Sequence, residues 1–296
     1  MKKRVTVSDI LQWIDDLAPF RFAENWDNCG LQVGNPQAEV SAVLVALDPS
    51  VLTVREAAQR RCQTLVVHHP LFNKAQTNLF LNRFPGAVVA EAIRHNVHII
   101  AAHTNLDAAS CGTNSVLAQT MGLIVQGSLE KLSEIPPDPR YLGLGLYGQL
   151  PKPCSALELM EQLAGLLDLQ AIRLVGDPEK LLHKVALCTG SGMSLLGRAV
   201  ENGCDAFITG DVKYHDAQSA LNQGIVVIDI GHFASEALVV RPLAEALKAS
   251  AWRHDAALDV WTCTVEKEPF LTVIFHDNRR ERLAGTAEVP GRTTDS

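Results

Sequence analysis

Short apolar runs alternate with amphipathic segments along the first hundred residues. Residues 43–47, 64–67 and 97–102 are runs rich in Val, Leu, Ile and Ala, a pattern that predicts strands buried in a sheet. The segments 51–61 and 86–95 between them repeat apolar residues at helical spacing. Strands that alternate with helices predict a mainly parallel sheet with helices on its faces.

The same order of elements recurs later in the chain. Strands are predicted at 185–188, 206–209 and 226–230, with helices at 195–202 and 216–222. In both halves a polar cluster follows the second strand and a His-x-x-x-acid sequence follows the third. We interpret this as an α/β protein of two related α/β/α lobes with mainly parallel or mixed sheets. The alternative is the general self-similarity of any α/β chain.

Prolines and a helix-capping pattern suggest the domain boundaries. A helix is predicted at 8–18, and three prolines make 128–140 the best candidate for a linker. A strand-like stretch and a helix that begins with a capping-box pattern follow, at 142–150 and 155–168. We therefore expect a first lobe (1–127), a second lobe with C-terminal strands that can partly pack back on the first (128–277), and a flexible polar tail (278–296).

Composition narrows the function classes. The 296 residues are 47% hydrophobic and 20% charged, which excludes disorder as the main state. Acidic residues exceed basic ones by seven, so the charge disfavours nucleic acid as a partner. Seven cysteines without a C-x-x-C pair argue against a disulfide framework and a thiolate zinc site. With no signal-peptide pattern and no apolar stretch that could span a bilayer, a cytoplasmic location away from membranes is expected.

Histidines and carboxylates form the strongest chemical pattern. They follow predicted strands, where open α/β sheets gather their ligands: His68, His69, His103, Asp107, His232 and Glu236. The last four form two pairs spaced four apart, which places imidazole and carboxylate on one face of a helical turn. Imidazole and carboxylate without thiolate suit Zn, Fe or Mn. For each histidine alone, the alternative is a hydrogen-bonded core or cap residue.

The number of these groups bears on how many metal ions they hold. Six ligand groups exceed the needs of one tetrahedral ion. They suit two divalent ions bridged by a carboxylate and a hydroxide, a pair that lowers the pKa of bound water. His68 and His69 either converge on one site or serve two neighbouring ions.

Two further segments carry candidate chemistry. Within the turn at 188–192, Thr189, Gly190, Ser191 and Gly192 precede a predicted helix. They either cradle an anion such as phosphate or form a tight strand-to-helix turn. Asp211 and His215 lie at the equivalent of His68 and His69 in the second half. They are either acid/base groups beside the metals or the start of a helix.

Taken together, the motifs resemble one family in content and order. The resemblance covers about residues 5–250 and concerns the Nif-three-like dinuclear-metal hexameric proteins, often called GTP cyclohydrolase I type 2 homologues. Its motifs are Trp26-Asp27-Asn28 with Gly30-Leu31 and Val33-Gly34, His68-His69-Pro70, His103-Thr104-Asn105-Leu106-Asp107, the 188–192 turn, Thr209-Gly210-Asp211, and Gly231-His232 with Ser235-Glu236.

The resemblance implies an assembly and a ligand set. Members resemble a toroidal homohexamer with two metal ions in each subunit, and here the site would lie in the cleft between the lobes. By motif match, His68, His69, Asp107, His232 and Glu236 take the metal-ligand positions, with Glu236 as the bridge, and His103 is adjacent to the metals.

The chain also departs from the family's pattern in several places. It is too short between the lobes for the inserted domain of many members. The segment after about 250 is longer than expected, and it could add a strand pair at a lobe's edge or at a subunit interface. Phe233 stands where histidine also occurs in the family, at no cost to the ligand set.

Three functions remain open at this point. The first is a metal-dependent hydrolase resembling GTP cyclohydrolase I type 2, which opens the ring of a purine nucleotide and releases formate. The second is a metal-binding, metal-delivery or scaffold protein without turnover. The third is a metal-dependent phosphoesterase, which would release phosphate instead. The substrate and the metal are not fixed by the sequence, because fold and ligand type admit several of each.

Overall fold

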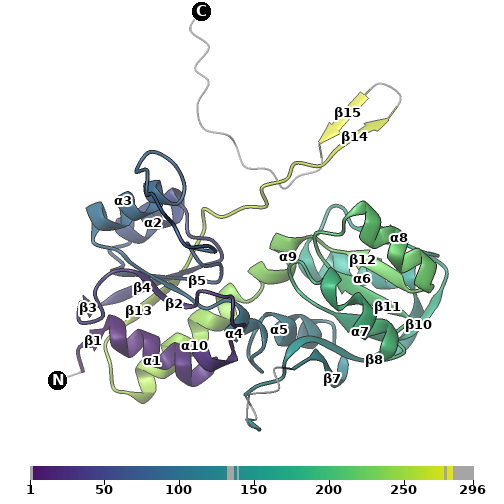
Figure 1. The fold of residues 1–296 in the computed structure, drawn as a ribbon, viewed down its shortest axis with the longest axis horizontal. Coiled ribbons are helices and arrows are strands. Elements are labelled where there is room, and N and C mark those ends of the chain that lie inside the picture. Colours follow the sequence, from purple (N-terminus) through teal and green to yellow (C-terminus); the bar gives the residue numbers. More distant parts are fainter. Residues whose placement is uncertain (1–2, 132–136, 139, 277–278, 283–296) are drawn as a thin grey trace, which may run out of the picture.

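The chain folds into two α/β lobes that lie side by side (Figure 1). A computed structural model describes residues 3–131, 137–138, 140–276 and 279–282. The first lobe is built on a five-stranded sheet and the second on a six-stranded sheet. The fold class predicted from the sequence is confirmed, and both sheets are mixed.

Parallel strands form the centre of the first sheet. Its order is β13-β4-β5-β6-β2, with bounds Asp259–Thr262, Ala42–Ala46, Thr64–Val67, His98–Ala101 and Gly30–Val33. The first four strands run parallel, and β2 closes the far edge in the antiparallel sense. Every residue of β4, β5 and β6 is buried, as expected for strands that are covered by helices on both faces.

Helices cover both faces of this sheet. On one face, α2 (Val51–Gln59) and α3 (Gly86–His95) pack through one apolar cluster. On the other, α1 (Val7–Leu17) packs together with α10 (Val240–Arg253), which returns from the far end of the sequence. Short elements complete the lobe: β1 (Val5–Thr6), the 3-10 helix η1 (Phe20–Phe22) and β3 (Glu39–Val40).

The second sheet has a parallel centre with antiparallel edges. Its order is β7-β8-β10-β11-β12-β9, with bounds Ile124–Glu130, Leu144–Ser155, Leu181–Leu187, Ala206–Thr209, Val226–Asp229 and Arg173–Val175. Only β10, β11 and β12 run parallel to one another. This triple corresponds to β4, β5 and β6, which agrees with the repeat seen in the sequence.

The helices of the second lobe also form two layers. One apolar cluster contains residues of α5 (Thr113–Thr120) and α6 (Ala156–Leu167). The other contains residues of the 3-10 helix η2 (Met193–Leu195), α7 (Leu196–Glu201) and α8 (Tyr214–Gln223). Two short helices, α4 (Thr104–Asp107) and α9 (His232–Ala237), lie where the lobes meet (Figure 1).

Some expected boundaries fall elsewhere in the structure. The boundary expected at 127/128 lies inside β7, so the predicted linker begins with strand residues; residues 132–136 and 139 lie outside the described residues. Both α10 and β13, which lie in the range 128–277 that was expected to pack partly back on the first lobe, belong to that lobe. The predicted tail begins with β15 (Arg279–Arg282), which pairs with β14 (Val273–His276); residues 283–296 lie outside the described residues.

Two carboxylates hold the segment that leaves β13. We call residues 263–272 the strap; it runs from the first lobe toward the β14–β15 hairpin beside the second lobe (Figure 1). Buried Glu56 of α2 accepts hydrogen bonds from the Cys263 thiol and from backbone and side-chain groups of Thr264. Glu266 in turn accepts from the backbone N–H groups of Leu47 and Asp48 at 2.8 and 2.6 Å. The strap therefore starts from a fixed position on the first lobe.

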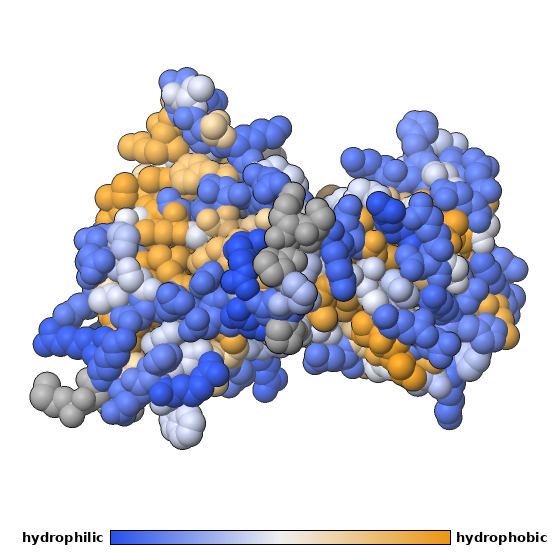
Figure 2. All heavy atoms as spheres, turned by 60° about the horizontal axis from the view of Figure 1, so that its bottom comes forward, coloured by the Kyte–Doolittle hydropathy of each residue, from blue (hydrophilic) through white to orange (hydrophobic). Residues whose placement is uncertain are grey.

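The structure also shows the polarity of the surface, the lengths of the helices and the state of the cysteines. On the face drawn in Figure 2, apolar side chains form a patch on the first lobe, whereas the second lobe is mostly polar. Among the described residues, no helix is long and apolar enough to cross a bilayer. All seven cysteines are free. The homohexamer stays a prediction.

The Glu56 anchor yields a stability prediction. Burial by itself would raise the Glu56 pKa, but hydrogen bonds from Cys263, Thr264 and Arg60 outweigh it and lower the pKa to about 2. A lowered pKa stabilises the fold above the unfolded-state value of 4.5, and this stabilisation is lost as pH falls toward 2. Glu56→Gln should lower the free energy of unfolding at pH 7 by about 1–3 kcal/mol, measured by urea denaturation.

The matched control is Glu39→Gln, because the Glu39 side chain is 65% exposed in its pair with Arg4. This control should change stability by less than about 0.5 kcal/mol. The difference between Glu56→Gln and wild type should shrink between pH 5 and pH 2. A difference that stays constant over that range would contradict the role given to the carboxylate.

Candidate metal centre

Three chain segments bring the predicted ligands together. His68 and His69 follow the carboxyl end of β5, and His103 follows β6 and precedes α4, which ends at Asp107. The third segment is α9 of the second lobe, which begins at His232 and carries Glu236 one turn later. All six residues thus lie beyond the carboxyl ends of parallel strands, as the sequence predicts.

The carboxylate of Glu236 lies at the centre of the cluster. Its Oε2 is 2.9 Å from Nε2 of His69 and 3.0 Å from Nε2 of His232. Its Oε1 is 3.8 Å from Nε2 of His68, which is also 3.5 Å from Oδ1 of Asp107. One oxygen therefore faces each of two ligand sets, which is the arrangement of a bridging carboxylate.

The ligand atoms fall into three overlapping groups whose members lie within 4.8 Å of one another. One group is His69, His232 and Glu236, and a second is His68, Asp107 and Glu236. The third contains His103 with His68 and His69. Because the first two groups share only Glu236, the geometry offers two adjacent ion positions.

Hydrogen bonds orient the two histidines after β5. Nδ1 of His68 lies 2.9 Å from the carbonyl oxygen of Ala102, and Nδ1 of His69 lies 2.8 Å from Oδ1 of Asp48. Since these acceptors take the Nδ1 proton, each neutral ring keeps a lone pair on Nε2. Both Nε2 atoms face Glu236, so the rings are set in the tautomer that binds metal.

The other two histidines are oriented in the same way. Nδ1 of His103 lies 2.9 Å from Oδ1 of Asp27, and Nδ1 of His232 lies 2.7 Å from Oδ2 of Asp211. A carboxylate behind the imidazole both fixes the ring and raises its basicity toward a cation. Three rings held by carboxylates and a fourth, His68, held by a backbone carbonyl are hard to explain as four independent core histidines.

Burial tests whether these residues fit a metal. His68 Nε2 and Glu236 Oε2 are buried without an aligned hydrogen-bond partner, although Oε2 lies within 3.0 Å of two imidazole nitrogens. Buried polar atoms left in this state destabilise a fold unless something else satisfies them. A divalent cation accepts electron pairs from both atoms, so the donor set fits such an ion.

The pKa values show how strongly the centre favours cations. Burial would raise the Glu236 pKa, yet the adjacent imidazoles of His232, His68 and His69 hold it well below its usual value. Burial lowers the pKa of His69, but Asp48 and Glu236 outweigh it and raise that pKa to about 10. The adjacent Glu236 carboxylate raises the His232 pKa to about 9. Positive charge at these nitrogens is therefore stabilised.

The glycine-rich turn lets the second lobe approach the centre. Gly190 has a φ of +65°, and a Cβ there would lie 2.1 Å from Oε1 of Glu236. A Cβ at Gly210 would lie 2.7 Å from the backbone nitrogen of His232. Both glycines are therefore needed for close packing against α9.

The same turn was also a candidate for binding phosphate. Three of its backbone N–H groups already donate to side-chain oxygens: Thr189 to Asn114, Gly190 to Ser235 and Gly192 to Thr209. Within residues 189–192, only the backbone N–H of Ser191 is not among these donors. Phosphate binding by the turn stays a prediction.

Asp211 and His215 lie in different surroundings. Asp211, with a φ of +55°, bonds to Nδ1 of His232 and so contacts the centre through a ligand. His215 is exposed near the start of α8, where its ring lies against Tyr214. An acid/base role for either residue stays a prediction.

Two orienting carboxylates were missed as site residues. Asp27 lies in the Trp26-Asp27-Asn28 motif and, besides His103, accepts from the backbone N–H of Thr104 at 3.0 Å. Asp48 follows β4 just as His68 follows β5. The signal that could have found Asp48 is its position: it is an acidic residue immediately beyond a buried parallel strand.

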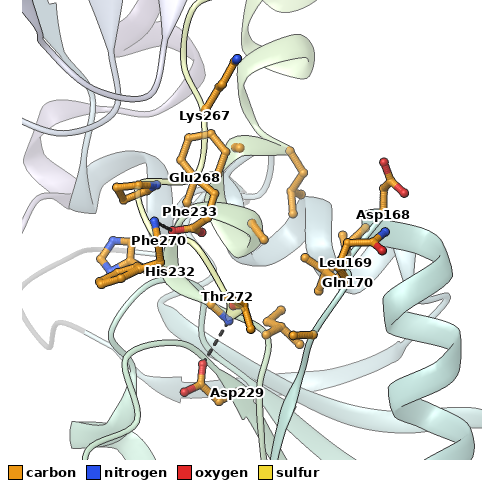
Figure 3. Close-up of a pocket in the computed structure, with 18 of the residues that line it drawn as sticks. Asp168, Leu169, Gln170, Asp229, His232, Phe233, Lys267, Glu268, Phe270 and Thr272 are labelled. Carbon is orange, nitrogen blue, oxygen red and sulfur yellow. Dashed lines mark hydrogen bonds between the residues drawn. The ribbon is translucent and has the colours of Figure 1, made fainter. Parts of the chain in front are cut away.

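A large cavity opens beside the centre. Its volume is about 1530 Å³, and it reaches the cluster at His69 and His232. The strap lines one part of it and residues 166–171, at the end of α6, line another (Figure 3). The centre is therefore accessible from the side of His69 and His232.

Comparison with known sequences finds one family and relatives that share one name. The profile of the family described as Duf34/NIF3 (NGG1p interacting factor 3) matches residues 5–269. A Streptomyces coelicolor protein named "GTP cyclohydrolase 1 type 2 homolog" is 34% identical over 276 residues, covering 89% of this chain and 96% of the relative. A Clostridium acetobutylicum protein of the same name is 31% identical over 230 residues, covering 78% and 85%.

Solved structures agree in fold. Staphylococcus aureus protein SA1388 superposes with a TM-score of 0.81 at 28% identity, covering 90% of this chain and 98% of that one. Reduced HcgD from Methanocaldococcus jannaschii superposes with a TM-score of 0.72 at 25% identity, covering 88% and 99%. A Bacillus cereus protein related to NIF3 scores 0.85 at 21% identity over 92% and 100%, which shows the fold alone.

The orienting role of Asp211 can be tested by substitution. Asp211→Asn removes the charge behind His232 but keeps a similar shape. We expect metal affinity to fall about 10–100-fold, measured by competition with a chromophoric chelator. Asp168→Asn is the control, because Asp168 lines the same cavity without an observed bond to a ligand. Equal affinities for the two variants would contradict the assignment.

The close approach of Gly190 gives a second test. In Gly190→Ala the new methyl group would overlap the Glu236 carboxylate, so we expect loss of metal binding in elemental analysis. Gly203→Ala is the matched control: its φ of +67° is nearly the same, but a Cβ there meets nothing within 4 Å. Both variants should lose about 1 kcal/mol of stability from backbone strain. Full metal content in Gly190→Ala would contradict the predicted overlap.

Proposed function

This chain belongs to the Duf34/NIF3 family, and from that premise we propose that it is a dinuclear-metal-dependent hydrolase. The observation that carries the proposal is the buried Glu236 carboxylate, whose two oxygens face two different ligand sets. Two divalent ions held there would supply hydroxide at neutral pH and stabilise negative charge that develops on a substrate.

Each proposed ligand set combines residues of both lobes. His68 and Asp107 would hold one ion with Glu236, and His69 and His232 the other. His103 is placed next to the first-lobe ligands and is oriented by its own carboxylate. Since all donors are imidazole nitrogen or carboxylate oxygen, Zn, Fe and Mn all remain candidates.

The proposed reaction follows the names of the relatives. The names of proteins called GTP cyclohydrolase 1 type 2 homolog suggest that one water attacks C8 of a purine nucleotide and opens the imidazole ring to a formamide. A second water then hydrolyses this formamide, which releases formate and leaves the amine. In this scheme Asp211 or His215 would move protons, and residues 189–192 would contact phosphate. The same metals would also serve a phosphoesterase, which releases phosphate in place of formate.

One observation favours a second candidate function, metal delivery or scaffolding without turnover. The side chains of His69 and His232 are 21% and 34% exposed, whereas those of His68 and Glu236 are only 1% and 5% exposed. An ion on the exposed side would exchange more readily than one on the buried side. We also propose a homohexamer, in line with the resemblance seen in the sequence.

The deciding experiment measures metal first and turnover second. Elemental analysis of untagged protein should give about two equivalents per chain in wild type and a sharp fall in Glu236→Ala. Purine nucleotides would then be screened for formate and phosphate release, and the variant should have lost any activity found. The control is Glu268→Ala, which lines the cavity outside the ligand groups.

Each outcome has a defined reading. Full turnover in Glu236→Ala contradicts the hydrolase proposal. Rapid loss of one equivalent to a chelator, with no turnover on any nucleotide, supports delivery instead. Little metal in wild type after reconstitution with excess Zn, Fe or Mn contradicts the ligand assignment itself.

A further inference from the structure

The cavity beside the metal centre has an apolar wall. Its lining includes side chains from α6 and the segment after it, from α9 and from the strap: Leu166, Leu167, Leu169, Phe233, Phe270 and Leu271. In Figure 3, Phe270 lies on the same side as His232, and Leu169 lies on the opposite side. The space between the two sides leads to the metal ligands.

Part of this wall is exposed at a cost in free energy. The residues Phe270 and Leu271 are 76% and 46% exposed. Apolar side chains in this position gain stability when a ligand covers them, by about 25 cal/mol for each Å² removed from water. A wall of this kind next to polar ligand atoms is typical of sites that bind small molecules.

The wall is held in place by the strap anchor. Glu266 fixes the strap to the backbone of Leu47 and Asp48. Farther along, the Phe270 backbone N–H donates to Oε1 of Glu268 at 3.1 Å. The family match ends at residue 269, so Phe270 and Leu271 lie just beyond the matched residues.

The charge of the cavity opposes a highly anionic ligand. Among its described lining residues, five carry carboxylates and two carry permanent positive charge. The carboxylates belong to Asp48, Asp168, Asp211, Asp229 and Glu268. Arg173 is already paired with Asp229, which leaves Lys267 to face an incoming phosphate. Outside the metal centre, which itself attracts anions, these side chains would repel a triphosphate more than they attract it.

We propose that this cavity binds a ligand with a single oxygen-donor head and an apolar or aromatic body. The head reaches the centre at His69 and His232, and the body lies against Phe233, Leu169 and Phe270. This inference rests on the metal centre of the proposed function and departs from the nucleotide substrate considered there. A weakly charged compound of this class binds in preference to a nucleoside triphosphate.

Straight-chain alkyl hydroxamates test the inference, because their head is a metal-binding oxygen donor and is uncharged at neutral pH. Protein reconstituted with Co²⁺ is titrated with the series from acetohydroxamate to octanohydroxamate, and binding is followed by visible absorption. Each further methylene should tighten binding by up to about fourfold. We expect octanohydroxamate to bind at least about tenfold tighter than acetohydroxamate.

The variant Phe270→Ser removes one side of the wall. It should reduce the gain in affinity from acetohydroxamate to octanohydroxamate at least about threefold. Because Phe270 is mostly exposed, the substitution should leave folding and cobalt content unchanged. The matched control is Phe80→Ser, which removes another exposed phenylalanine that does not line the cavity. The control should keep the full gain with chain length.

The outcomes separate this inference from the function on which it rests. Failure of the chain to bind cobalt contradicts the metal centre and the inference together. A cobalt-loaded chain that binds all hydroxamates equally contradicts the inference alone. Displacement of octanohydroxamate by GTP at lower concentration than by benzohydroxamate also contradicts it, because the triphosphate would then be the preferred ligand.

Discussion

A buried negative charge organises this molecule. The Glu236 side chain is only 5% exposed, and a carboxylate in such surroundings requires positive charge or strong donors around it. Imidazoles from both lobes provide these neighbours, within 2.9 to 3.8 Å of its oxygens. The lobes therefore meet at a point where neither is complete alone, since the first lobe brings His68 and His69 and the second brings the carboxylate.

The two parallel strand triples explain how this meeting is built. Asp48, His68 and His103 follow the carboxyl ends of β4, β5 and β6. The Gly190 turn, Asp211 and His232 follow those of β10, β11 and β12. The carboxyl ends of both sheets thus point their polar residues at one place. Orienting carboxylates and ligands come from neighbouring strands, so sheet register fixes their separation. Glycines at 190 and 210 leave room for α9 to pack closely against the carboxyl ends of the second sheet.

The sequence predicted the features of the site that depend on local patterns, but not those that depend on long-range pairing. Local patterns located the strands and helices that end at the site, because buried runs and helical spacing are short-range signals. Spacing also paired His103 with Asp107 and His232 with Glu236. The expectation that the C-terminal part can pack back on the first lobe did not identify β4 as the partner of β13, because that pairing joins residues more than two hundred apart. Asp27 and Asp48 act only through rings that folding brings to them, so their motif and their position after a strand did not reveal their orienting role.

The strap connects the apolar wall to the metal ligands through bonded steps. Glu266 accepts the Asp48 backbone N–H, and the Asp48 side chain holds Nδ1 of His69. Displacement of the strap would thus move the residue that orients a ligand, and a ligand that packs on Phe270 would favour the strap position in which Asp48 is held. Because the strap joins Phe270 to the residue that holds His69, occupancy of the cavity would favour the orientation of His69, and that orientation would in turn favour occupancy.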